Sequence, residues 1–251
     1  MLRGKNAIIT GASRAIGIGA ATARAFARAG ADVLFTTYTP YDSEIHQHEV
    51  DEANDLLALL RGHGVGAHRL ELDLSHPDAA VELFDYAQKQ LGQIHILVNN
   101  ATYWTQGGVA ELTAEMLDKH YALNLRGTAL LCAEFAKRFQ GEAGRIINLT
   151  SGQGLTPMPN ELAYAATKGA VEALTTSLSA GLASKHITVN AVDPGITDTG
   201  WVTPEFMTQL IREAPMGRVG TPEDAARLIL FLASDEAQWM TGQIIRSRGG
   251  L

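Results

Sequence analysis

Three side chains in the C-terminal half of the sequence have the types and spacing needed for proton transfer. Tyr164 and Lys168 stand four residues apart in a segment of helical composition, which places them on one face, one turn apart. A tyrosine hydroxyl has a pKa of about 10, and a neighbouring ammonium lowers it. Such a tyrosine can pass a proton to or from a carbonyl oxygen. Ser151, where the preceding strand-like run ends, can steady the charge on the same oxygen.

A glycine-rich turn at residues 10–19 follows an apolar, strand-like run and opens an alanine-rich helix. Glycines let the chain turn tightly and let a pyrophosphate approach the backbone, while the helix N-terminus supplies unpaired N–H groups. The turn therefore predicts dinucleotide binding, with a simple strand-to-helix turn as the alternative.

The end of the second strand bears on the choice of cofactor. It reads Thr36, Thr37 and Tyr38, without the acidic residue that usually bonds a ribose 2′-hydroxyl, and Asp42 comes only later. Arg14 in the glycine turn could meet a 2′-phosphate, or it could be a solvated loop charge. We therefore expect NADP (NADPH) in preference to NAD.

Strand-like and helix-like segments alternate along the chain and must position these groups. The strand-like segments cover residues 6–10, 32–37, 67–72, 94–99, 145–150, 187–192 and 243–246. The helical segments cover residues 20–29, 51–61, 77–90, 113–139 (bent near Gly127), 162–183 and 222–233. This alternation predicts one α/β domain over residues 1–251, with a doubly wound parallel sheet of the Rossmann type and helices on both faces.

Two long connections interrupt the alternation, and long loops in compact domains are often functional. The first, residues 38–50, contains His46 and His48; with no third ligand we expect no metal, but a solvated loop or a fold over the adenosine end of the cofactor. The second, residues 195–220 with a short helix at 204–213, is expected to form a mobile lid over the substrate. Loop side chains that could wall an apolar substrate pocket, or simply pack, are Tyr103, Trp104, Met158, Pro159 and Trp201.

Composition excludes several classes of protein. The 251 residues carry a formal net charge of −7, which disfavours nucleic acid and anionic membranes as partners. The one cysteine, Cys132, cannot form an internal disulfide and lies in an apolar run, which predicts a buried thiol in a reducing compartment. No signal peptide and no membrane-spanning run is evident, so we expect a cytoplasmic protein.

These motifs resemble, over residues 5–250, those of the short-chain dehydrogenase/reductase family. They occur in the family's order: the Thr10-Gly11 turn, Asp73-Leu74, Asn99-Asn100-Ala101, Asn124, Ser151, Tyr164-x-x-x-Lys168 and Pro194-Gly195. Ser151 lies thirteen residues before Tyr164, as in the family. The pattern is most similar to the 3-oxoacyl-carrier-protein reductase branch.

The resemblance implies a role for each catalytic residue. Ser151 would polarise the substrate oxygen, and Tyr164 would act as acid or base. Lys168 would lower the tyrosine pKa and bind the nicotinamide ribose. Asn124 would hold a water that links Lys168 to solvent; capping or bending its helix is the alternative.

The resemblance also implies a cofactor groove. The contacts would be Gly11, Ser13, Arg14, Gly17, Ile18, Gly19, Asp73, Leu74, Asn99, Ala101, Tyr164, Lys168, Pro194, Gly195, Ile196 and Thr199. Asp73 and Leu74 would contact adenine, and residues 194–199 would cradle the nicotinamide end. Asp73 could instead be a turn residue, and Asn99 could stabilise the end of the sheet.

The sequence departs from the family pattern at three places. Gly11 and Gly17 are six residues apart instead of the usual four, which indicates either a two-residue insertion around residues 14–16 or Ala15 in place of the middle glycine. Thr102 stands where the family has glycine, and residues 246–248, Arg-Ser-Arg, replace an acidic residue near the C-terminus. None of these changes removes a proton-transfer group.

We therefore predict an NADP-dependent oxidoreductase that reduces a small-molecule ketone or aldehyde, with 3-oxoacyl compounds as candidates, and that can run in reverse. One alternative is a non-catalytic NADP-binding sensor or regulator on the same fold, against which the intact Ser151, Tyr164 and Lys168 argue. Another is an enoyl reductase, which the widened glycine turn resembles but the Ser151-to-Tyr164 spacing does not. The resemblance also implies a homo-oligomer, a tetramer or dimer built through the helices at 113–139 and 162–183.

Overall fold

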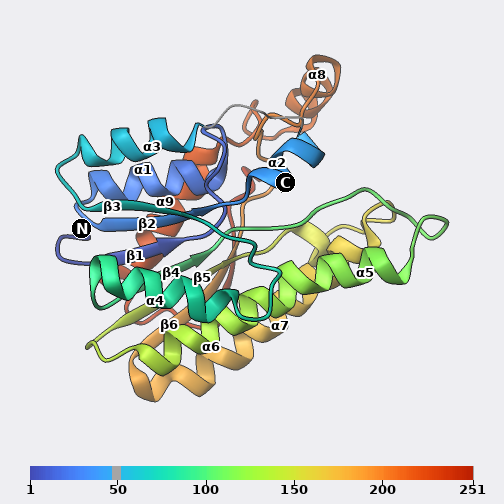
Figure 1. Ribbon diagram of the computed structural model, residues 1–251. Helices are drawn as coiled ribbons and strands as arrows, with labels where there is room; N and C mark the ends of the chain where they lie inside the picture. The colour runs from blue at the N-terminus through green and yellow to red at the C-terminus, as the bar shows by residue number, and fades with distance from the viewer. Residues whose placement is uncertain (47–51, 251) are drawn as a thin grey trace.

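In this computed structural model, which describes residues 1–46 and 52–250, seven parallel strands form one sheet in the order β3-β2-β1-β4-β5-β6-β7 (Figure 1). The strands are β1 (Asn6–Ile9), β2 (Asp32–Thr37), β3 (Ala67–Glu71), β4 (Ile96–Asn99), β5 (Gly144–Leu149), β6 (Ile187–Asp193) and β7 (Ile244–Arg246). Strand β1 pairs with both β2 and β4, so the direction of winding reverses between β1 and β4. Ligands of doubly wound sheets bind at the carboxyl ends of the strands beside this switch point.

Helices cover both faces of the sheet, which confirms the predicted Rossmann-type architecture (Figure 1). The helices are α1 (Ile18–Arg28), α2 (Thr39–His46), α3 (Ala53–Arg61), α4 (Ala79–Leu91), α5 (Ala114–His120), α6 (Thr128–Arg138), α7 (Leu162–Leu182), α8 (Pro204–Glu213) and α9 (Pro222–Ala233). Helices α1, α3 and α9 share one apolar core with the sheet, and α4, α6 and α7 share the other. Strands β4 and β5 are buried throughout, as continuous apolar runs between two helical layers should be.

The long helix predicted at residues 113–139 is helical throughout, but its middle is wound differently. Between α5 and α6 the segment Tyr121–Gly127 is a π-helix, and Asn124 lies within it. Such segments are uncommon and are frequent at functional sites. Gly127 ends the π-segment where a Cβ atom would lie 2.7 Å from the carbonyl oxygen of Leu74, so this glycine permits a close approach to the loop after β3.

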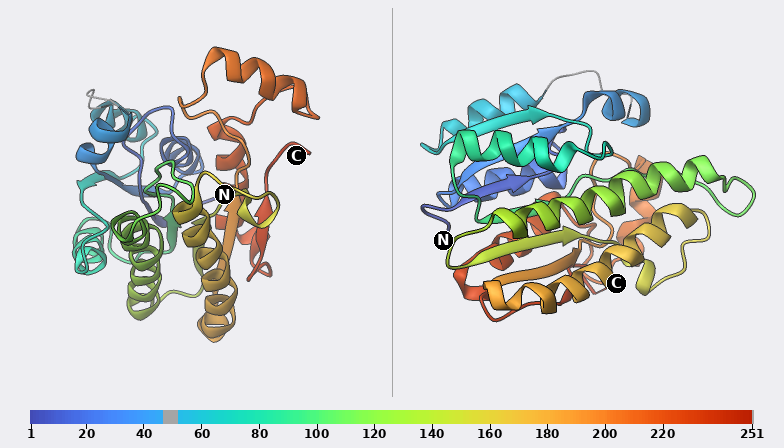
Figure 2. Two further views of the ribbon diagram at one scale, coloured as in Figure 1. Left: turned by 90° about the vertical axis from the view of Figure 1, so that its right-hand side faces the viewer. Right: turned by 60° about the horizontal axis from the view of Figure 1, so that its bottom comes forward.

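The connection predicted at residues 38–50 contains a helix, α2, which corrects the expectation of an irregular loop. Residues 47–51, and with them His48, lie outside the described residues. Pro77 precedes α4 instead of occupying its first turn, because the chain first closes a turn from Ala79 N to His76 O. The other predicted elements agree with the structure to within two residues at each end. The left view of Figure 2 shows α8 projecting from the body of the molecule.

Candidate active site

The glycine-rich turn connects β1 to α1 at the carboxyl edge of the sheet. Gly11 has a φ of +70°, and a Cβ atom there would lie 2.7 Å from the Cα atom of Ala101. Gly17 caps the N-terminus of α1, while a Cβ atom at Gly19 would overlap the carbonyl oxygen of Gly11. Residues 14–17 close an extra turn through the bond from Gly17 N to Arg14 O (3.0 Å). Since Gly17 and Gly19 take the helix-start and close-packing places of such turns, the structure favours the two-residue insertion.

Arg14, at the start of the inserted turn, is held by two other segments. Its Nη1 donates to the carbonyl oxygen of Thr199 (3.1 Å), and its Nε lies 3.7 Å from the carboxylate of Asp42 in α2. Asp42 is itself buried. Arg14 is therefore more than a solvated charge, and a 2′-phosphate would compete with Asp42 for its guanidinium group.

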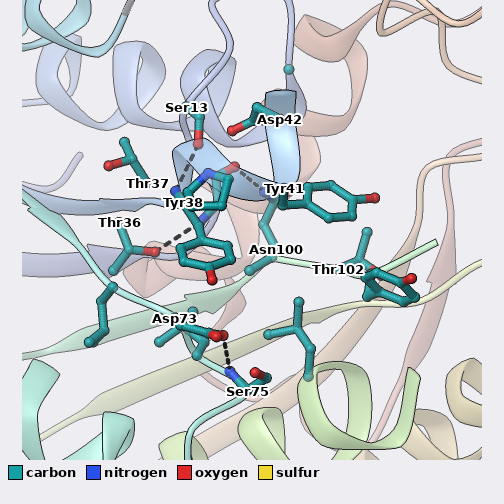
Figure 3. A pocket seen from close by; sticks show the side chains of 18 of the residues that line it. Ser13, Thr36, Thr37, Tyr38, Tyr41, Asp42, Asp73, Ser75, Asn100 and Thr102 are labelled. Carbon is teal, nitrogen blue, oxygen red and sulfur yellow. Dashed lines mark hydrogen bonds between the residues drawn. The ribbon is translucent and has the colours of Figure 1, made fainter. Parts of the chain in front are cut away.

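A cavity of about 630 Å³ lies in front of the glycine turn, between α2, the end of β3 and the loop after β4 (Figure 3). Nine predicted cofactor residues line it: Gly11, Ser13, Arg14, Gly17, Ile18, Asp73, Leu74, Ala101 and Thr199. The Asp73 carboxylate lies near the Tyr38 hydroxyl and raises its pKa, and Asp73 Oδ1 accepts from Ser75 N (2.8 Å). Ser13 Oγ accepts from Tyr38 N (3.2 Å), and Thr37 Oγ1 is buried with no partner among the described residues. The cavity is of the size that holds small-molecule ligands.

Two neighbouring asparagines after β4 differ in what they contact. Asn99 Nδ2 donates to Asn148 Oδ1 (2.8 Å) and to Cys132 Sγ (3.3 Å), so its side chain lies between the sheet and helix α6. Asn100, which was not among the predicted cofactor contacts, lines the cavity and donates through Nδ2 to the carbonyl oxygen of Gly11 (2.7 Å). The Asn99 side chain therefore stabilises the end of the sheet, and the Asn100 side chain holds the glycine turn.

Ser151, Tyr164 and Lys168 meet at the carboxyl end of β5. Ser151 is the second residue after the strand, and its side chain lies close enough to the Tyr164 hydroxyl to lower the pKa of that hydroxyl. Lys168, one turn further along α7, donates from Nζ to the carbonyl oxygen of Leu149 (2.8 Å). The same nitrogen lies 5.5 Å from the centre of the Tyr164 ring. The structure thus brings the three predicted catalytic side chains together.

Burial has the largest effect on the pKa values of Tyr164 and Lys168. It raises the pKa of Tyr164 above its ordinary value of 10, and the hydrogen bond with Ser151 acts in the opposite direction. Burial also lowers the pKa of Lys168 to about 8. The sequence predicts that Lys168 lowers the tyrosine pKa; burial is a separate and larger influence, so the net direction is upward. The reason is that desolvation of the hydroxyl outweighs the other influences, while the lysine ammonium lies against the ring and Leu149.

Asn124 contacts the loop after β4 and helix α7. Its Oδ1 accepts from Tyr103 N (2.7 Å) and Thr102 Oγ1 (3.1 Å). Its Nδ2 donates to Tyr103 O (2.9 Å) and Thr167 Oγ1 (3.1 Å). These four bonds use the full capacity of the amide group. A water could bind the Asn124 side chain only by replacing one of them, so the side chain ties two elements together.

The residues predicted for the nicotinamide end follow β6. Gly195 has a φ of +65°, and Thr197 Oγ1 donates to Pro194 O (3.0 Å), which closes a tight turn. Thr199 lines the large cavity, whereas Ile196 lines a second cavity of about 240 Å³ beside α8. Pro194 and Gly195 line neither of these two.

Tyr41 is a site residue that sequence reasoning missed. Its hydroxyl accepts a hydrogen bond from Trp104 N (3.3 Å), and its ring centre lies 5.6 Å from that of Tyr103. Tyr103 in turn packs edge-on against buried His120, at 4.9 Å. Helix α2 therefore lies against the loop after β4 at the cavity (Figure 3). The only signal in the sequence was the length of the 38–50 connection.

Other predictions concern residues beyond Ser151, Tyr164, Lys168 and the predicted cofactor contacts. Cys132 is fully buried, as predicted, and burial raises the pKa of its thiol to about 12. Of the loop side chains expected at a substrate pocket, Tyr103 lines the large cavity, while Trp104 donates to Glu161 and Trp201 to the carbonyl oxygen of Thr197. Within residues 1–46 and 52–250, no cluster of three His, Cys, Asp or Glu side chains could hold a metal ion. Among the same residues, 1–46 and 52–250, no helix is long and apolar enough to cross a membrane.

A doubly wound sheet with a glycine turn, a cavity at the switch point and a serine–tyrosine–lysine group defines the class of dinucleotide-dependent oxidoreductases. A family model described as enoyl-(acyl carrier protein) reductase matches residues 11–251. The chain belongs to the short-chain dehydrogenase/reductase family, whose members bind nicotinamide cofactors and act on small molecules. This confirms the resemblance drawn from the motifs.

Relatives and solved structures align over nearly the whole chain. The uncharacterized oxidoreductase YjdA of Bacillus subtilis is 48% identical over 249 residues, which cover 98% of this chain and 96% of YjdA. An NADPH-dependent aldehyde reductase-like chloroplastic protein of Arabidopsis thaliana is 37% identical, over 99% of this chain and 94% of its own. A short-chain dehydrogenase/reductase structure from Serratia marcescens has a TM-score of 0.89 and 32% identity, over 99% of this chain and 98% of its own.

Proposed function

We propose that this protein is an NADP-dependent carbonyl reductase, which converts a ketone or aldehyde to an alcohol and can run in reverse. The observation that carries the proposal is the contact of Ser151 with Tyr164, with the Lys168 ammonium against the tyrosine ring. Two neighbouring hydroxyls beside a buried cation are suited to proton transfer at one substrate oxygen. Candidate substrates include 3-oxoacyl compounds, after the reductase branch that the motifs resemble.

Tyr164 is the proton donor in this proposal. Its raised pKa keeps the hydroxyl protonated near neutral pH, which is the form that gives a proton to a carbonyl oxygen. Ser151 donates a hydrogen bond to the same oxygen as charge develops on it. Lys168 stabilises the tyrosinate left behind, whose charge is otherwise costly in a buried place. The chemistry supplied by a bound nicotinamide is hydride donation to the carbonyl carbon.

The residues around the large cavity fit a dinucleotide. Side chains at Gly11 or Gly19 would collide with neighbouring backbone, so the turn stays bare for a pyrophosphate at the N-terminus of α1. NADP is favoured because Arg14 lies in this turn and no acidic residue directly follows β2. The Arabidopsis relative, which is NADPH-dependent by name, supports the same choice.

The remaining assignments belong to the same proposal. Asn124 acts as a positioning residue that holds the loop after β4 against α7. Residues 195–220 form the substrate lid, whose two ends are pinned together by bonds between Gly220 and the segment 196–198. Apolar side chains exposed along α5 and α6, among them Leu117 and Leu130, provide a surface for the expected homo-oligomer.

The test is turnover of a panel of ketones, aldehydes and 3-oxoacyl thioesters with NADPH and separately with NADH, followed by the absorbance of the reduced cofactor. We expect turnover of at least one carbonyl class, with a higher kcat/KM for NADPH. Tyr164→Phe should abolish turnover and leave NADPH affinity largely intact, whereas Tyr86→Phe on α4 should change neither. Retained activity in Tyr164→Phe would overturn the mechanism. NADPH binding without turnover across the panel would favour a regulator.

An enoyl reductase is the second candidate function. The widened glycine turn favours it, because the turn resembles that branch and the matching family model carries that description. An enoyl thioester added to the panel separates the two. Reduction of its carbon–carbon double bond, with the ketones untouched, would replace the present proposal.

A further inference from the structure

An ion pair lies at the carboxyl end of β6, beside the turn proposed for the nicotinamide. Asp193 is 1% exposed, and its Oδ1 accepts from Gly195 N (2.9 Å). Both carboxylate oxygens accept from Arg248 Nη1, at 3.2 and 2.9 Å. The backbone of the same strand end accepts from Ser247 N (2.8 Å). Asp193 therefore fastens the C-terminal segment to the Pro194-Gly195 turn.

The Arg248 side chain passes over two glycines on its way to this carboxylate. A Cβ atom at Gly195 would lie 3.0 Å from Arg248 Cγ, and one at Gly152 would overlap Arg248 Nη1. Gly152 directly follows Ser151. One guanidinium group thus packs against the segment that carries the proposed oxygen-binding serine and, through Asp193, against the proposed cofactor turn.

The pair is too enclosed to be a surface ion pair. The Arg248 side chain is 13% exposed and that of Asp193 is 2% exposed. Arg248 Nε is buried with no partner among the described residues, which is a cost that a purely stabilising contact has no reason to carry. A buried ion pair contributes little to stability as a whole, but removing one partner leaves an unpaired buried charge and is costly.

We propose that Arg248 is a positioning residue for the reaction, which through Asp193 holds the Ser151-Gly152 segment and the Pro194-Gly195 turn in fixed register. This assignment deepens the proposed function and rests on it. Removing the clamp lets the serine and the cofactor turn shift relative to one another, and misplacements of about 1 Å cost up to about a hundredfold in rate.

The same pair has an electrostatic consequence at Tyr164. The groups that act on its hydroxyl are Ser151 after β5, Asp193 at the end of β6, Glu161 before α7 and Tyr41 from α2, with Lys168 against its ring. Asp193 raises the pKa of Tyr164, and Arg248 offsets that charge. Loss of Arg248 should therefore raise the tyrosine pKa further, and loss of the Asp193 charge should lower it.

The experiment compares Arg248→Gln, Asp193→Asn and the double variant with wild type, in alcohol oxidation measured across pH. Oxidation needs deprotonated Tyr164, so its rate rises with pH. We expect the midpoint of that rise, measured in the cofactor-bound enzyme, to move up in Arg248→Gln and down in Asp193→Asn. It should return close to wild type in the double variant. The kcat of Arg248→Gln should fall about tenfold or more with the substrate KM nearly unchanged.

Arg145→Gln is the matched control. Arg145 is a buried arginine that contacts Asp235 at the opposite end of β5. Its loss should lower the melting temperature without moving the pH midpoint. If Arg248→Gln does not fold, Asp193→Asn and the double variant still differ in midpoint, because only the former leaves an unpaired cation.

Two results would overturn the assignment: midpoints that move in the same direction or not at all, and an unchanged kcat in Arg248→Gln. Absence of turnover in wild type would instead refute the proposed function. The Arg248 assignment is then decided by NADPH affinity, measured from cofactor fluorescence. Weaker binding in Arg248→Gln than in Arg145→Gln supports it, and equal binding rejects it.

Discussion

Replacing Lys168 by methionine should stabilise the protein near neutral pH while it removes the proposed catalytic cation. Lys168 is 4% exposed, and burial lowers its pKa from 10.5 to about 8. Since one pKa unit corresponds to about 1.4 kcal/mol, the buried ammonium costs about 3 kcal/mol below pH 8. Methionine is of similar length and uncharged, but it loses the hydrogen bond to Leu149 O, worth about 1 kcal/mol. The net gain in free energy of unfolding is about 2 kcal/mol.

The sign of the pH dependence follows from the same shift in pKa. Below pH 8 the lysine is protonated in both the folded and the unfolded chain, so the cost is fully present. As the pH rises from about 8 toward 10.5, the folded lysine loses its proton first, and the stability of wild type rises relative to the variant. The advantage of Lys168→Met should therefore close by about pH 10.

Urea unfolding of wild type, Lys168→Met and the exposed-lysine control Lys89→Met, from about pH 7 to about pH 10, measures this difference directly. The control should match wild type throughout. A Lys168→Met protein less stable than wild type at neutral pH would refute the reasoning. A constant difference across the series would refute it as well, because the titration of Lys168 would then not be its cause.

Three further predictions test the cofactor turn and the core. Gly19→Ala places a Cβ atom onto the carbonyl oxygen of Gly11, so NADPH binding and stability should both fall, whereas Gly181→Ala, whose Cβ would meet open space, should lower neither; equal NADPH titrations for the two would contradict the close packing. Asp42→Asn releases Arg14, so the ratio of NADPH to NADH affinity should rise about tenfold; an unchanged ratio would mean that Arg14 does not contact the 2′-phosphate. The buried Cys132 thiol, with its pKa raised to about 12, should react with a thiol-specific dye only after unfolding, and rapid labelling of native protein would exclude this burial.

Regular spacing made the strand ends and α7 predictable. Tyr164 and Lys168 are brought together by the helical repeat alone, and Ser151 by its place directly after a buried strand. The glycine turn was predictable as a cofactor site because it joins the first strand to the first helix. The sequence does not distinguish a two-residue insertion in this turn from Ala15 in place of the middle glycine. That choice depends on which glycine packs against the Gly11 carbonyl oxygen.

Contacts between segments far apart in the chain do not produce a regular spacing in the sequence, so they are not predictable from it. Arg14 bonds Thr199, 185 residues away, and Arg248 reaches Asp193 across 55 residues. The sequence does not predict helix α2, because its eight residues lack a strong apolar repeat. The net direction of the Tyr164 pKa is not predictable for a related reason: sequence spacing reveals the nearby lysine, but it does not reveal how completely the hydroxyl is desolvated.

The pKa of Tyr164 also bears on which direction of the reaction the site favours. Near neutral pH a tyrosine that resists ionisation carries the proton that carbonyl reduction consumes, whereas alcohol oxidation requires that this proton first be removed. Glu161 and Asp193 both raise that pKa, whereas the hydrogen bond with Ser151 lowers it. Asp193, the smallest of these influences, is paired with Arg248. We therefore expect the pH dependence of alcohol oxidation to respond to Arg248, a residue of the C-terminal segment that itself takes no part in proton transfer.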